Sequence, residues 1–367
     1  MRPLLRLLFG LCPTLAPAVV LTWDTSAQPG FQPGPGAWND LLAWSSDGVG
    51  RTAWVGGADA VFRGSALGGT AAITLGLPVE VGDLTFGGTA GEVTRGDWSL
   101  TGMGLSLGRA SRWEVGAGSR VQVLATVSGV ERWTKGGEGD LWLAGESLHR
   151  GGLTVESGDL VLRHALGAGY GPVDMAGGRL SLETGGILYN LLVLSAARVE
   201  VHADRVDAQA APLGTTWAGV VSGTGMLVKT GRGELRLAGA NTFSGGLTIA
   251  GGMVAVSQGT GLGRGPVRLE GGGVFVESVA ALDDAHAQRQ VLRRAHLHRQ
   301  AKTVQQLRAQ FAFFGVATAH QHKAGGVAHA QAFALHQVLA GCGYVNQQID
   351  QMVFQQIDLV DIQKAPV

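Results

Sequence analysis

Seven acidic residues could supply general acid and base chemistry if the fold brought two of them together. They are Asp83, Asp97, Glu114, Asp140, Glu156, Asp159 and Asp174. Cleavage of a polysaccharide requires two carboxyl groups a few ångströms apart, one of them with a displaced pKa. Their spacing in the sequence does not converge on such a pair, so we expect acids that face water. Single alanine changes at Asp140, Glu156 or Asp174 should then alter the free energy of unfolding by no more than about 0.5 kcal/mol.

Two pairs of histidines could bind zinc or copper. His296 and His298 are separated by one residue, as are His320 and His322. A closed metal site takes its ligands from fixed positions supported by further side chains, and neither pair has a cysteine or carboxylate at a suitable spacing. We therefore expect solvated histidines, no metal and no cofactor. The sequence also lacks GxSxG, HExxH and a phosphate-binding loop, so we predict no catalytic residues and no enzymatic activity.

Three tryptophans near the N-terminus have two interpretations. Trp38, Trp44 and Trp54 could form an aromatic platform for sugars, or they could cover the open end of a repeat array. They lie in one short block and do not recur once per repeat, which favours the covering role.

The elements that must position these residues are very short strands. Between Ser222 and Glu277, apolar residues recur at every second position in brief runs, and glycine closes each run. This pattern predicts strands of about three to five residues separated by turns, and it does not fit a helix. Between Leu84 and Val121 the runs follow one another every seven to eight residues, which predicts a coil of about 22 residues built from three strands.

The same stretch has an upstream copy, from Ser128 to Glu183, at a constant offset of about 94 residues. Matched positions include Lys135 with Lys229, Gly139 with Gly233, Leu141 with Leu235, and Gly145 with Gly239. Most identities are turn glycines and apolar residues, so the two copies share a backbone shape and not a set of reactive groups.

The run GTGMLVKTGRGELRLAGANTFSGGLTIAGGMVAV, from Gly223 to Val256, resembles the autotransporter-associated β-strand repeat, also called the passenger-associated transport repeat. The resemblance implies an all-β chain folded as a right-handed parallel β-helix and exported to the bacterial surface. The upstream copy departs from the pattern where Asn241, Thr242 and Phe243 become Ser147, Leu148 and His149, so we expect a differently built turn there.

The predicted key residues of the repeat are structural. They are the turn residues Gly231, Gly233, Gly239, Asn241, Gly245 and Gly246. Asparagine adopts the left-handed region and bonds neighbouring backbone, so Asn241→Val should cost about 1 to 2 kcal/mol. A bulky residue at Gly231, Gly233 or Gly239 should cost about 1 to 3 kcal/mol, because positive φ or close coil packing is expected there.

Four segments are predicted. Residues 1–18 resemble a secretory signal peptide, with Arg2 and Arg6 before an apolar run and a cut after Ala18, or alternatively after Ala27. Residues 19–126 form a tryptophan- and glycine-rich β-solenoid block. Residues 127–277 form a β-helix that holds the two repeats, 128–183 and 222–277. Residues 278–367 are a histidine- and glutamine-rich tail, predicted to be helical or disordered.

The tail has three interpretations. It could be a helical cap, a segment that binds a partner or a metal, or a continuation outside the ancestral reading frame. Apolar residues at helical spacing, such as Val304, Leu307 and Phe311, fit an amphipathic helix. The abrupt loss of glycine and the end of the repeats fit a change of frame.

Composition limits the partners. The chain has 28 basic and 28 acidic residues and a formal net charge of zero, so it offers no basic surface for nucleic acid. Its two cysteines, Cys12 and Cys342, leave no internal disulfide once a signal peptide is removed. Host or cell-surface glycans or proteins are the expected partners. The unpaired last rung near Val274 also predicts end-to-end self-association.

These patterns predict a secreted or surface-displayed β-helical passenger-type protein with a structural or adhesive role. The alternatives are a β-helical carbohydrate-active enzyme, similar to a polysaccharide lyase or hydrolase, and a truncated or frame-disrupted relic without function. The resemblance implies an outer-membrane barrel, and the sequence shows no alternating strands of that kind near its end. We therefore expect the barrel on another polypeptide or an interrupted gene.

Overall fold

The structure is a computed structural model that describes residues 18–31, 34–64, 70–87, 95–205 and 213–276. The predicted tail, both histidine pairs, Cys12 and Cys342 lie outside these residues, as does the predicted signal peptide apart from Ala18.

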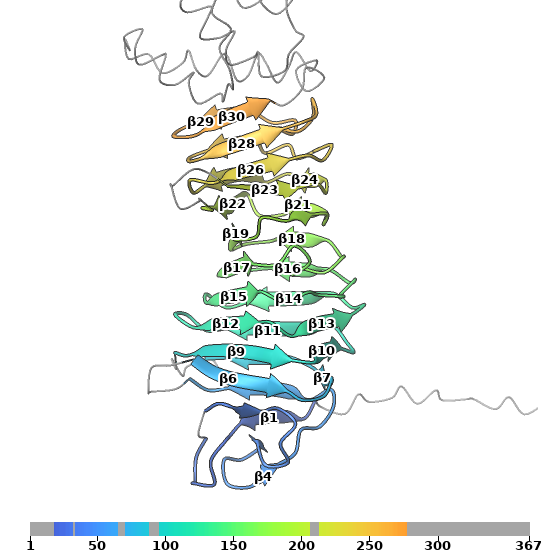
Figure 1. Cartoon of the computed structure of the whole chain (residues 1–367), viewed down its shortest axis with the longest axis vertical. Coiled ribbons are helices and arrows are strands. Elements are labelled where there is room, and N and C mark those ends of the chain that lie inside the picture. The colour runs from blue at the N-terminus through green and yellow to red at the C-terminus, as the bar shows by residue number, and fades with distance from the viewer. Residues whose placement is uncertain (1–17, 32–33, 65–69, 88–94, 206–212, 277–367) are drawn as a thin grey trace, which may run out of the picture.

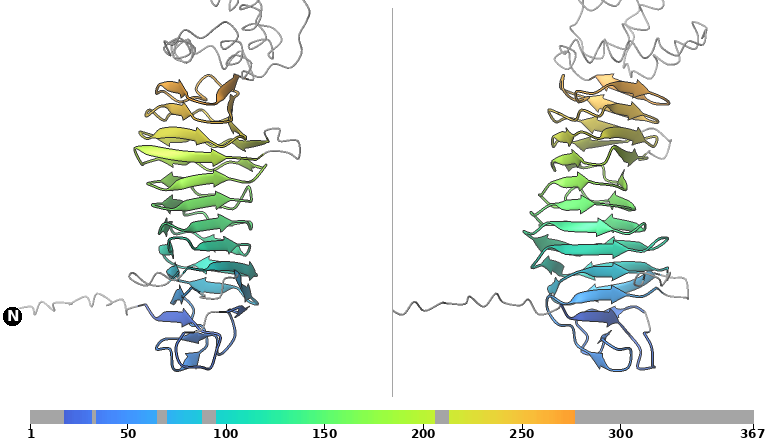
Figure 2. Two further views of the ribbon diagram at one scale, coloured as in Figure 1. Left: turned by 90° about the vertical axis from the view of Figure 1, so that its left-hand side faces the viewer. Right: turned by 180° about the vertical axis from the view of Figure 1, so that it is seen from behind.

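The chain folds as a parallel β-helix, which confirms the predicted fold class. The described residues form thirty strands and no helix. The strands stack into one rod, with β1 and β4 at the lower end of Figure 1 and β29 and β30 at the upper end of the described part. The further views in Figure 2 show the same stacking from the other sides of the rod. Each full coil contributes one segment to each of three sides.

Side 1 is an eleven-stranded sheet. Its strands are β1 (Val20–Trp23), β3 (Trp44–Ser45), β4 (Arg51–Thr52), β5 (Asp59–Phe62), β8 (Leu84–Phe86), β11 (Ser111–Val115), β14 (Trp133–Gly136), β16 (Leu153–Val155), β18 (Val173–Met175), β21 (Leu192–Leu194) and β24 (Val221–Gly223). Only the pairs β1 with β3 and β3 with β4 are antiparallel among the described strands.

Side 2 is a second eleven-stranded sheet. It contains β2 (Gly36–Ala37), β6 (Thr70–Leu75), β9 (Asp97–Gly102), β12 (Arg120–Val123), β15 (Asp140–Leu143), β17 (Asp159–Leu162), β19 (Arg179–Leu182), β22 (Arg198–Ala203), β25 (Met226–Thr230), β27 (Leu247–Ile249) and β29 (Val267–Leu269).

Side 3 is split into a three-stranded and a five-stranded sheet. The first holds β7 (Val79–Val81), β10 (Gly104–Leu107) and β13 (Thr126–Gly129), and the second holds β20 (Ile187–Leu188), β23 (Gly214–Trp217), β26 (Glu234–Leu237), β28 (Met253–Val256) and β30 (Gly273–Val276).

The core is a set of inward columns that run along the rod. In β6 the burial alternates residue by residue, because successive side chains of a strand point to opposite faces. The parallel register then places each inward residue above an inward residue of the coil below. On side 2 one such column contains Trp98, Val121, Leu141 and Leu160, all of them buried.

The coil is shorter in the repeat region than predicted. Along the same column, Val121, Leu141, Leu160 and Leu180 lie 20, 19 and 20 positions apart. Trp98 and Val121, in the block from which about 22 residues were predicted, lie 23 apart. The longer coil has longer strands, because β9 and β11 hold six and five residues whereas β12 and β14 of the next coil hold four each.

The two sequence repeats occupy different sides of the rod. Lys135 lies in β14 on side 1, whereas its match Lys229 lies in β25 on side 2. Likewise Leu153 lies in β16 on side 1, and its match Leu247 lies in β27 on side 2. The offset between the copies is therefore four coils plus one side.

Candidate functional site

The turn residues predicted from the repeat lie where consecutive coils come closest. Gly231 and Gly246 have φ values of 80° and 98°, in the left-handed region that favours glycine. The other three glycines are constrained by packing. A Cβ atom would lie within 3.0 Å of backbone of the coil below at Gly239 and Gly245, and at 3.0 Å from such backbone at Gly233.

Asn241 connects three consecutive coils. It is buried, and its Oδ1 accepts a hydrogen bond from the Val221 amide of the coil below at 2.7 Å. Its Nδ2 donates to the Gly261 carbonyl of the coil above, also at 2.7 Å. The side chain therefore satisfies one donor and one acceptor that are shielded from water, in addition to forming a turn.

We expect Asn241→Val to lower the free energy of unfolding by about 2 to 3 kcal/mol, because it leaves a buried N–H and a buried carbonyl without partners. The adjacent Thr242 is exposed, so Thr242→Val is a matched control that should change little. Urea denaturation followed by circular dichroism measures both variants. Equal stability of the two would contradict the bridging role.

The upstream copy builds the equivalent turn differently, as its sequence suggests. Ser147 Oγ donates to the Val127 carbonyl at 3.0 Å and accepts from the His149 amide at 3.3 Å, so it contacts only the coil below and its own turn. His149 is buried where the second copy has Phe243, and it meets Trp133 edge-on at 6.2 Å between ring centroids. Neither ring nitrogen of His149 makes a hydrogen bond.

Burial lowers the pKa of His149 below its usual value of 6.5. The unfolded chain therefore binds the proton more tightly, and stability should fall as pH falls through 6.5. We expect His149→Phe to raise stability by about 1 kcal/mol at pH 7.5 and to remove part of this acid sensitivity. Urea titrations at pH 5 and pH 7.5 test this, with outward His202→Gln as control. An unchanged pH dependence in His149→Phe would contradict it.

A buried lysine replaces an apolar residue in the core of each repeat. Lys135 is fully buried in the inward column of side 1, between Trp113 and Val155. Its Nζ donates to the carbonyls of Gly137 at 2.5 Å, Gly139 at 2.7 Å and Ser157 at 2.7 Å. The first two belong to its own turn and the third to the coil above, so the ammonium group joins two coils.

Lys229 repeats this arrangement on side 2. Its Nζ donates to the carbonyls of Thr230 at 2.7 Å, Gly231 at 3.0 Å, Gly251 at 3.2 Å and Ala203 at 3.4 Å. Burial lowers the pKa of both lysines from 10.5 to about 8. The two lysines match between the repeats, but the sequence alone predicted no role for them. The available signal was a charged residue at an inward position of the alternation in both copies.

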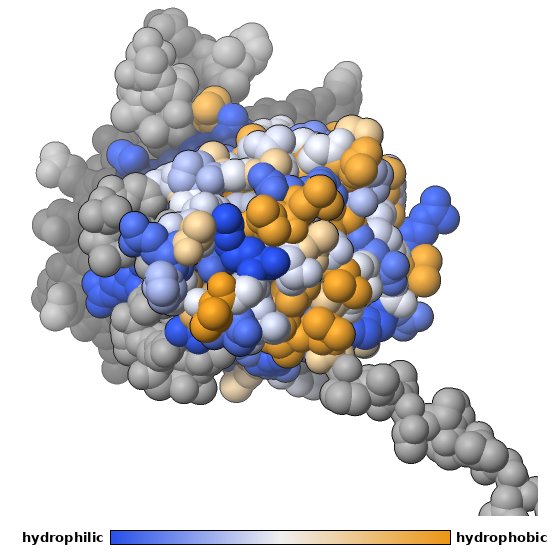
Figure 3. Space-filling model, turned by 90° about the horizontal axis from the view of Figure 1, so that it is seen from below, coloured by the Kyte–Doolittle hydropathy of each residue, from blue (hydrophilic) through white to orange (hydrophobic). Residues whose placement is uncertain are grey.

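The N-terminal tryptophans fill the lower end of the core. Trp38 and Trp44 are fully buried and their rings lie 4.8 Å apart, with the partly buried Trp54 at 4.6 Å from Trp44. Rings covered in this way offer no open platform to a sugar, which favours the covering role. Apolar side chains also gather on the outside of this end (Figure 3), and Leu41 and Val49 are among the exposed ones.

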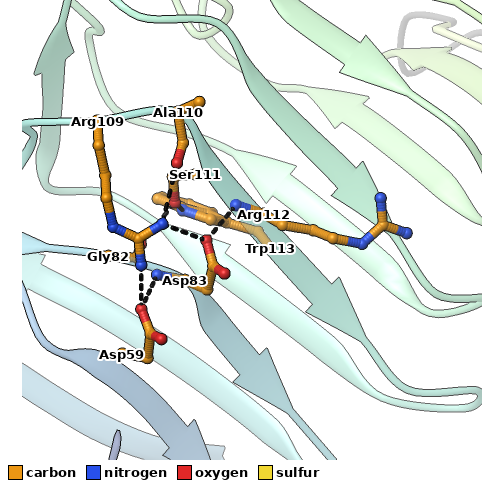
Figure 4. A network of polar contacts seen from close by, with 8 residues as sticks. All are labelled: Asp59, Gly82, Asp83, Arg109, Ala110, Ser111, Arg112 and Trp113. Atoms are coloured by element: carbon orange, nitrogen blue, oxygen red, sulfur yellow. Dashed lines mark hydrogen bonds and ion pairs between the residues drawn. The ribbon is translucent and has the colours of Figure 1, made fainter. Parts of the chain in front are cut away.

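The candidate acids form ion pairs on the outer faces of the sheets. Six of the seven pair with arginine: Asp83 with Arg109, Glu114 and Glu156 with Arg112, Asp140 with Arg120, Asp159 with Arg179, and Asp174 with Arg132. Figure 4 shows the lowest network, in which the Arg109 guanidinium joins Asp59 of β5 to Asp83, while the Arg112 amide also donates to Asp83. Asp97 lies beside Arg120 in the ladder.

The structure brings Asp140 and Asp159 together, which the sequence did not predict. They are direct partners in the ladder between β15 and β17. Burial and, next, the charge of Asp159 raise the pKa of Asp140 above 3.8. Arg120 of the coil below forms an ion pair with Asp140, and Arg179 of the coil above forms one with Asp159. An arginine therefore flanks the acidic pair on each side, as expected in a structural ladder, although a displaced pKa is also a feature of catalytic acids.

Within the described residues, no group of three or more histidine, cysteine or acidic side chains is placed to hold a metal ion. None of the described segments forms a helix long and apolar enough to cross a membrane.

The rod, its inward lysines and its bridged turns define a protein built on a parallel β-helical solenoid. The family model of the passenger-associated transport repeat matches residues 134–162 and 227–256, which confirms the resemblance stated from the sequence. The curated protein "Adhesin BmaC autotransporter" of Brucella suis biovar 1 (strain 1330) is 32% identical over 164 residues. The match covers 42% of this chain and 4% of that relative. No solved structure matches the chain.

Proposed function

We propose that this chain is an adhesive segment of a surface-displayed passenger, with its β-helix serving as a rigid spacer and binding surface and with no catalytic role. The observation that carries the proposal is the pair of transport repeats built into one continuous β-helix, together with the similarity to an adhesin. The ladders and bridged turns support a rod that holds its shape outside the cell, because each coil is bonded to both of its neighbours.

Attachment of coated particles to cells tests the proposal. Microspheres carrying the full chain should adhere to cultured epithelial cells several-fold more than spheres carrying albumin or the heat-unfolded chain. Attachment no greater than that of albumin would contradict an adhesive role.

The second candidate is a polysaccharide-cleaving enzyme, and it draws on the Asp140 and Asp159 pair alone. It requires turnover of a polysaccharide by the full chain and loss of that turnover in Asp140→Asn. We expect no release of reducing ends by either protein, because arginine neutralises both carboxylates. Turnover that Asp140→Asn abolishes would replace the adhesive proposal with the enzymatic one.

A further inference from the structure

One edge of the rod, where side 3 turns into side 1, carries large side chains that the fold leaves in water. We call it the aromatic edge and define it as Val130, Arg150, Tyr170, Tyr189, Leu191 and Val220. Tyr170 and Tyr189 are 56% and 70% exposed, and Val130 is 72% exposed. The chain has three tyrosines, and two of them lie here on consecutive coils.

The edge is a column and not a scatter of residues. Trp133, Leu153, Val173 and Leu192 are successive partners in the side 1 ladder. Val130, Arg150, Tyr170 and Tyr189 each precede one of these partners by three positions. The ladder continues through the turn, because the Arg150 amide donates to the Gly129 carbonyl at 2.9 Å and the Tyr170 amide donates to the His149 carbonyl at 2.8 Å.

The turns that present the two tyrosines are held from inside. Asn190, next to Tyr189, is buried and its Nδ2 donates to the carbonyls of Gly169 at 2.9 Å and Gly171 at 2.7 Å. These two carbonyls flank Tyr170. The Asn190 carbonyl in turn accepts a hydrogen bond from Trp217 Nε1 at 2.8 Å. A surface fixed in this way loses little conformational entropy when a ligand binds.

The edge also offers one positive charge. Arg150 is exposed and makes no ion pair within the described part of the chain, whereas nearby Arg132 is paired with Asp174 at 3.6 Å. Glu131, on the coil below, does not pair with Arg150 either. A free guanidinium binds carboxylate or sulfate groups by two parallel hydrogen bonds. Because the formal net charge is zero, an anion would be recognised by this local group and not by the charge of the whole chain.

Ring faces and a guanidinium in one row match the chemistry of a charged sugar polymer. Aromatic rings contact the apolar faces of sugar rings, and the guanidinium contacts the acidic substituents. The edge lies at the corner between two sides, and its column of Val130, Arg150, Tyr170 and Tyr189 presents one side chain per coil, which suits a linear ligand that runs along the rod axis. The described strands beside it are paired within the ladder, so the edge offers no free strand to an extended peptide.

We infer that the aromatic edge binds a single strand of an anionic polysaccharide lying along the rod axis, with Tyr170 and Tyr189 against the sugar rings and Arg150 on the acidic groups. This inference rests on the adhesive function proposed above and names the ligand class of that function.

Binding of defined polysaccharides to the full chain tests the inference. Hyaluronan and heparin oligosaccharides distinguish a carboxylate from a sulfate source, and dextran oligosaccharides provide a neutral comparison in isothermal titration calorimetry. We expect the anionic probes to bind and dextran to bind at least about tenfold more weakly, which corresponds to about 1.4 kcal/mol. The double variant Tyr170→Ser and Tyr189→Ser should lose about tenfold or more in affinity, and Arg150→Gln should reduce the anionic probes to the level of dextran.

Control variants distinguish a loss of binding at the aromatic edge from a loss of folding. The double variant Tyr170→Phe and Tyr189→Phe keeps both rings and should bind as well as the unmodified chain. Arg232→Gln removes an exposed arginine of another surface and should also leave affinity unchanged. All variants should unfold at the same urea concentration as the parent.

Three outcomes would overturn the inference: no binding of either anionic probe, unchanged affinity of the serine variant, or equal binding of polyglutamate, which would show that charge alone is recognised. The fate of the adhesive proposal is read separately from the coated microspheres. If spheres carrying the parent chain attach to cells but calorimetry shows no binding of either anionic probe, the adhesive role stands and the polysaccharide site fails. If spheres carrying the parent chain do not attach, the adhesive proposal fails whatever the calorimetry shows.

Discussion

Replacing Lys229 by methionine is expected to lower the free energy of unfolding by about 2 to 3 kcal/mol at pH 7, since buried carbonyls lose their donor at about 1 to 3 kcal/mol for each group left without a partner. Relief of a buried positive charge offsets part of this loss, which is why the expected figure is smaller than the sum over four carbonyls. Methionine has a similar length and fills the same space, so the variant removes the donor without leaving a large cavity.

The cost of this substitution should grow with pH. Burial lowers the pKa of Lys229 to about 8, against 10.5 in the unfolded chain. The unfolded chain therefore holds the proton more tightly between these values, and the parent protein gains stability as pH rises from 8 to 10.5. Lys229→Met lacks this gain, so the difference between parent and variant should widen over the same range.

Hydrogen exchange of the two consecutive coils that contain β25 and β27 measures the effect directly, because opening in a repeat array is local. Arg232→Met is the control: Arg232 lies three positions from Lys229, is exposed and pairs with Asp204 at 3.1 Å, and because exposed ion pairs contribute little, the variant should exchange nearly as the parent does. Lys135→Met should show the same loss around β14 and β16. If the backbone amides of Lys229→Met are as protected from exchange as those of the parent, both at pH 7 and above pH 8, the ammonium group does not join the coils.

Gly231→Val should be at least as damaging, at about 3 to 5 kcal/mol. A β-branched residue at a φ of 80° is strained by about 1 to 3 kcal/mol. Its Cβ would also lie within 3.0 Å of the carbonyl of Ala203 in the coil below, and forced overpacking adds about 1 to 3 kcal/mol. The same movement would displace the Gly231 carbonyl from Lys229.

Gly214→Val is the control for this change. Gly214 begins β23, its φ is not positive, and the nearest atom to an added Cβ is the flexible Glu234 carboxylate at 3.3 Å. Urea denaturation should therefore separate the two valine variants clearly. Comparable stability would mean that the turn at Gly231 adapts, and it would remove the argument that these glycines fix the coil.

The sequence predicted the type of fold because the determinants are local. Alternation in runs such as Leu235 and Leu237, each closed by glycine, sets strand length and turn position without reference to the rest of the chain. Closure into a coil of 20 residues was not predictable to the residue, since the lengths of the strands and turns depend on how one coil packs on the next. The side of the rod on which each repeat lies could not be predicted from the sequence for the same reason.

The site was predictable only where a side chain acts on its own turn. Asn241 was identified as a turn residue, but its bonds to Val221 and Gly261 cross to other coils and leave no trace in local sequence. The partnership of Asp140 with Asp159 depends on coil length in the same way. Lys135 and Lys229 occupy inward positions where the alternation predicts apolar residues. A single exception of this kind indicates no role, and only its recurrence at the matched position of the other copy marks it as part of the repeat.

The placement of the two repeats on different sides has a consequence for valency. A copy displaced by whole coils would point the same way as its parent and would place duplicated surface groups in one row. Displacement by four coils and one side turns the copy to face another direction. A rod lengthened by such duplications displays its motifs along a spiral around its axis. A neighbouring surface can therefore bind one of the copies from any direction around the rod.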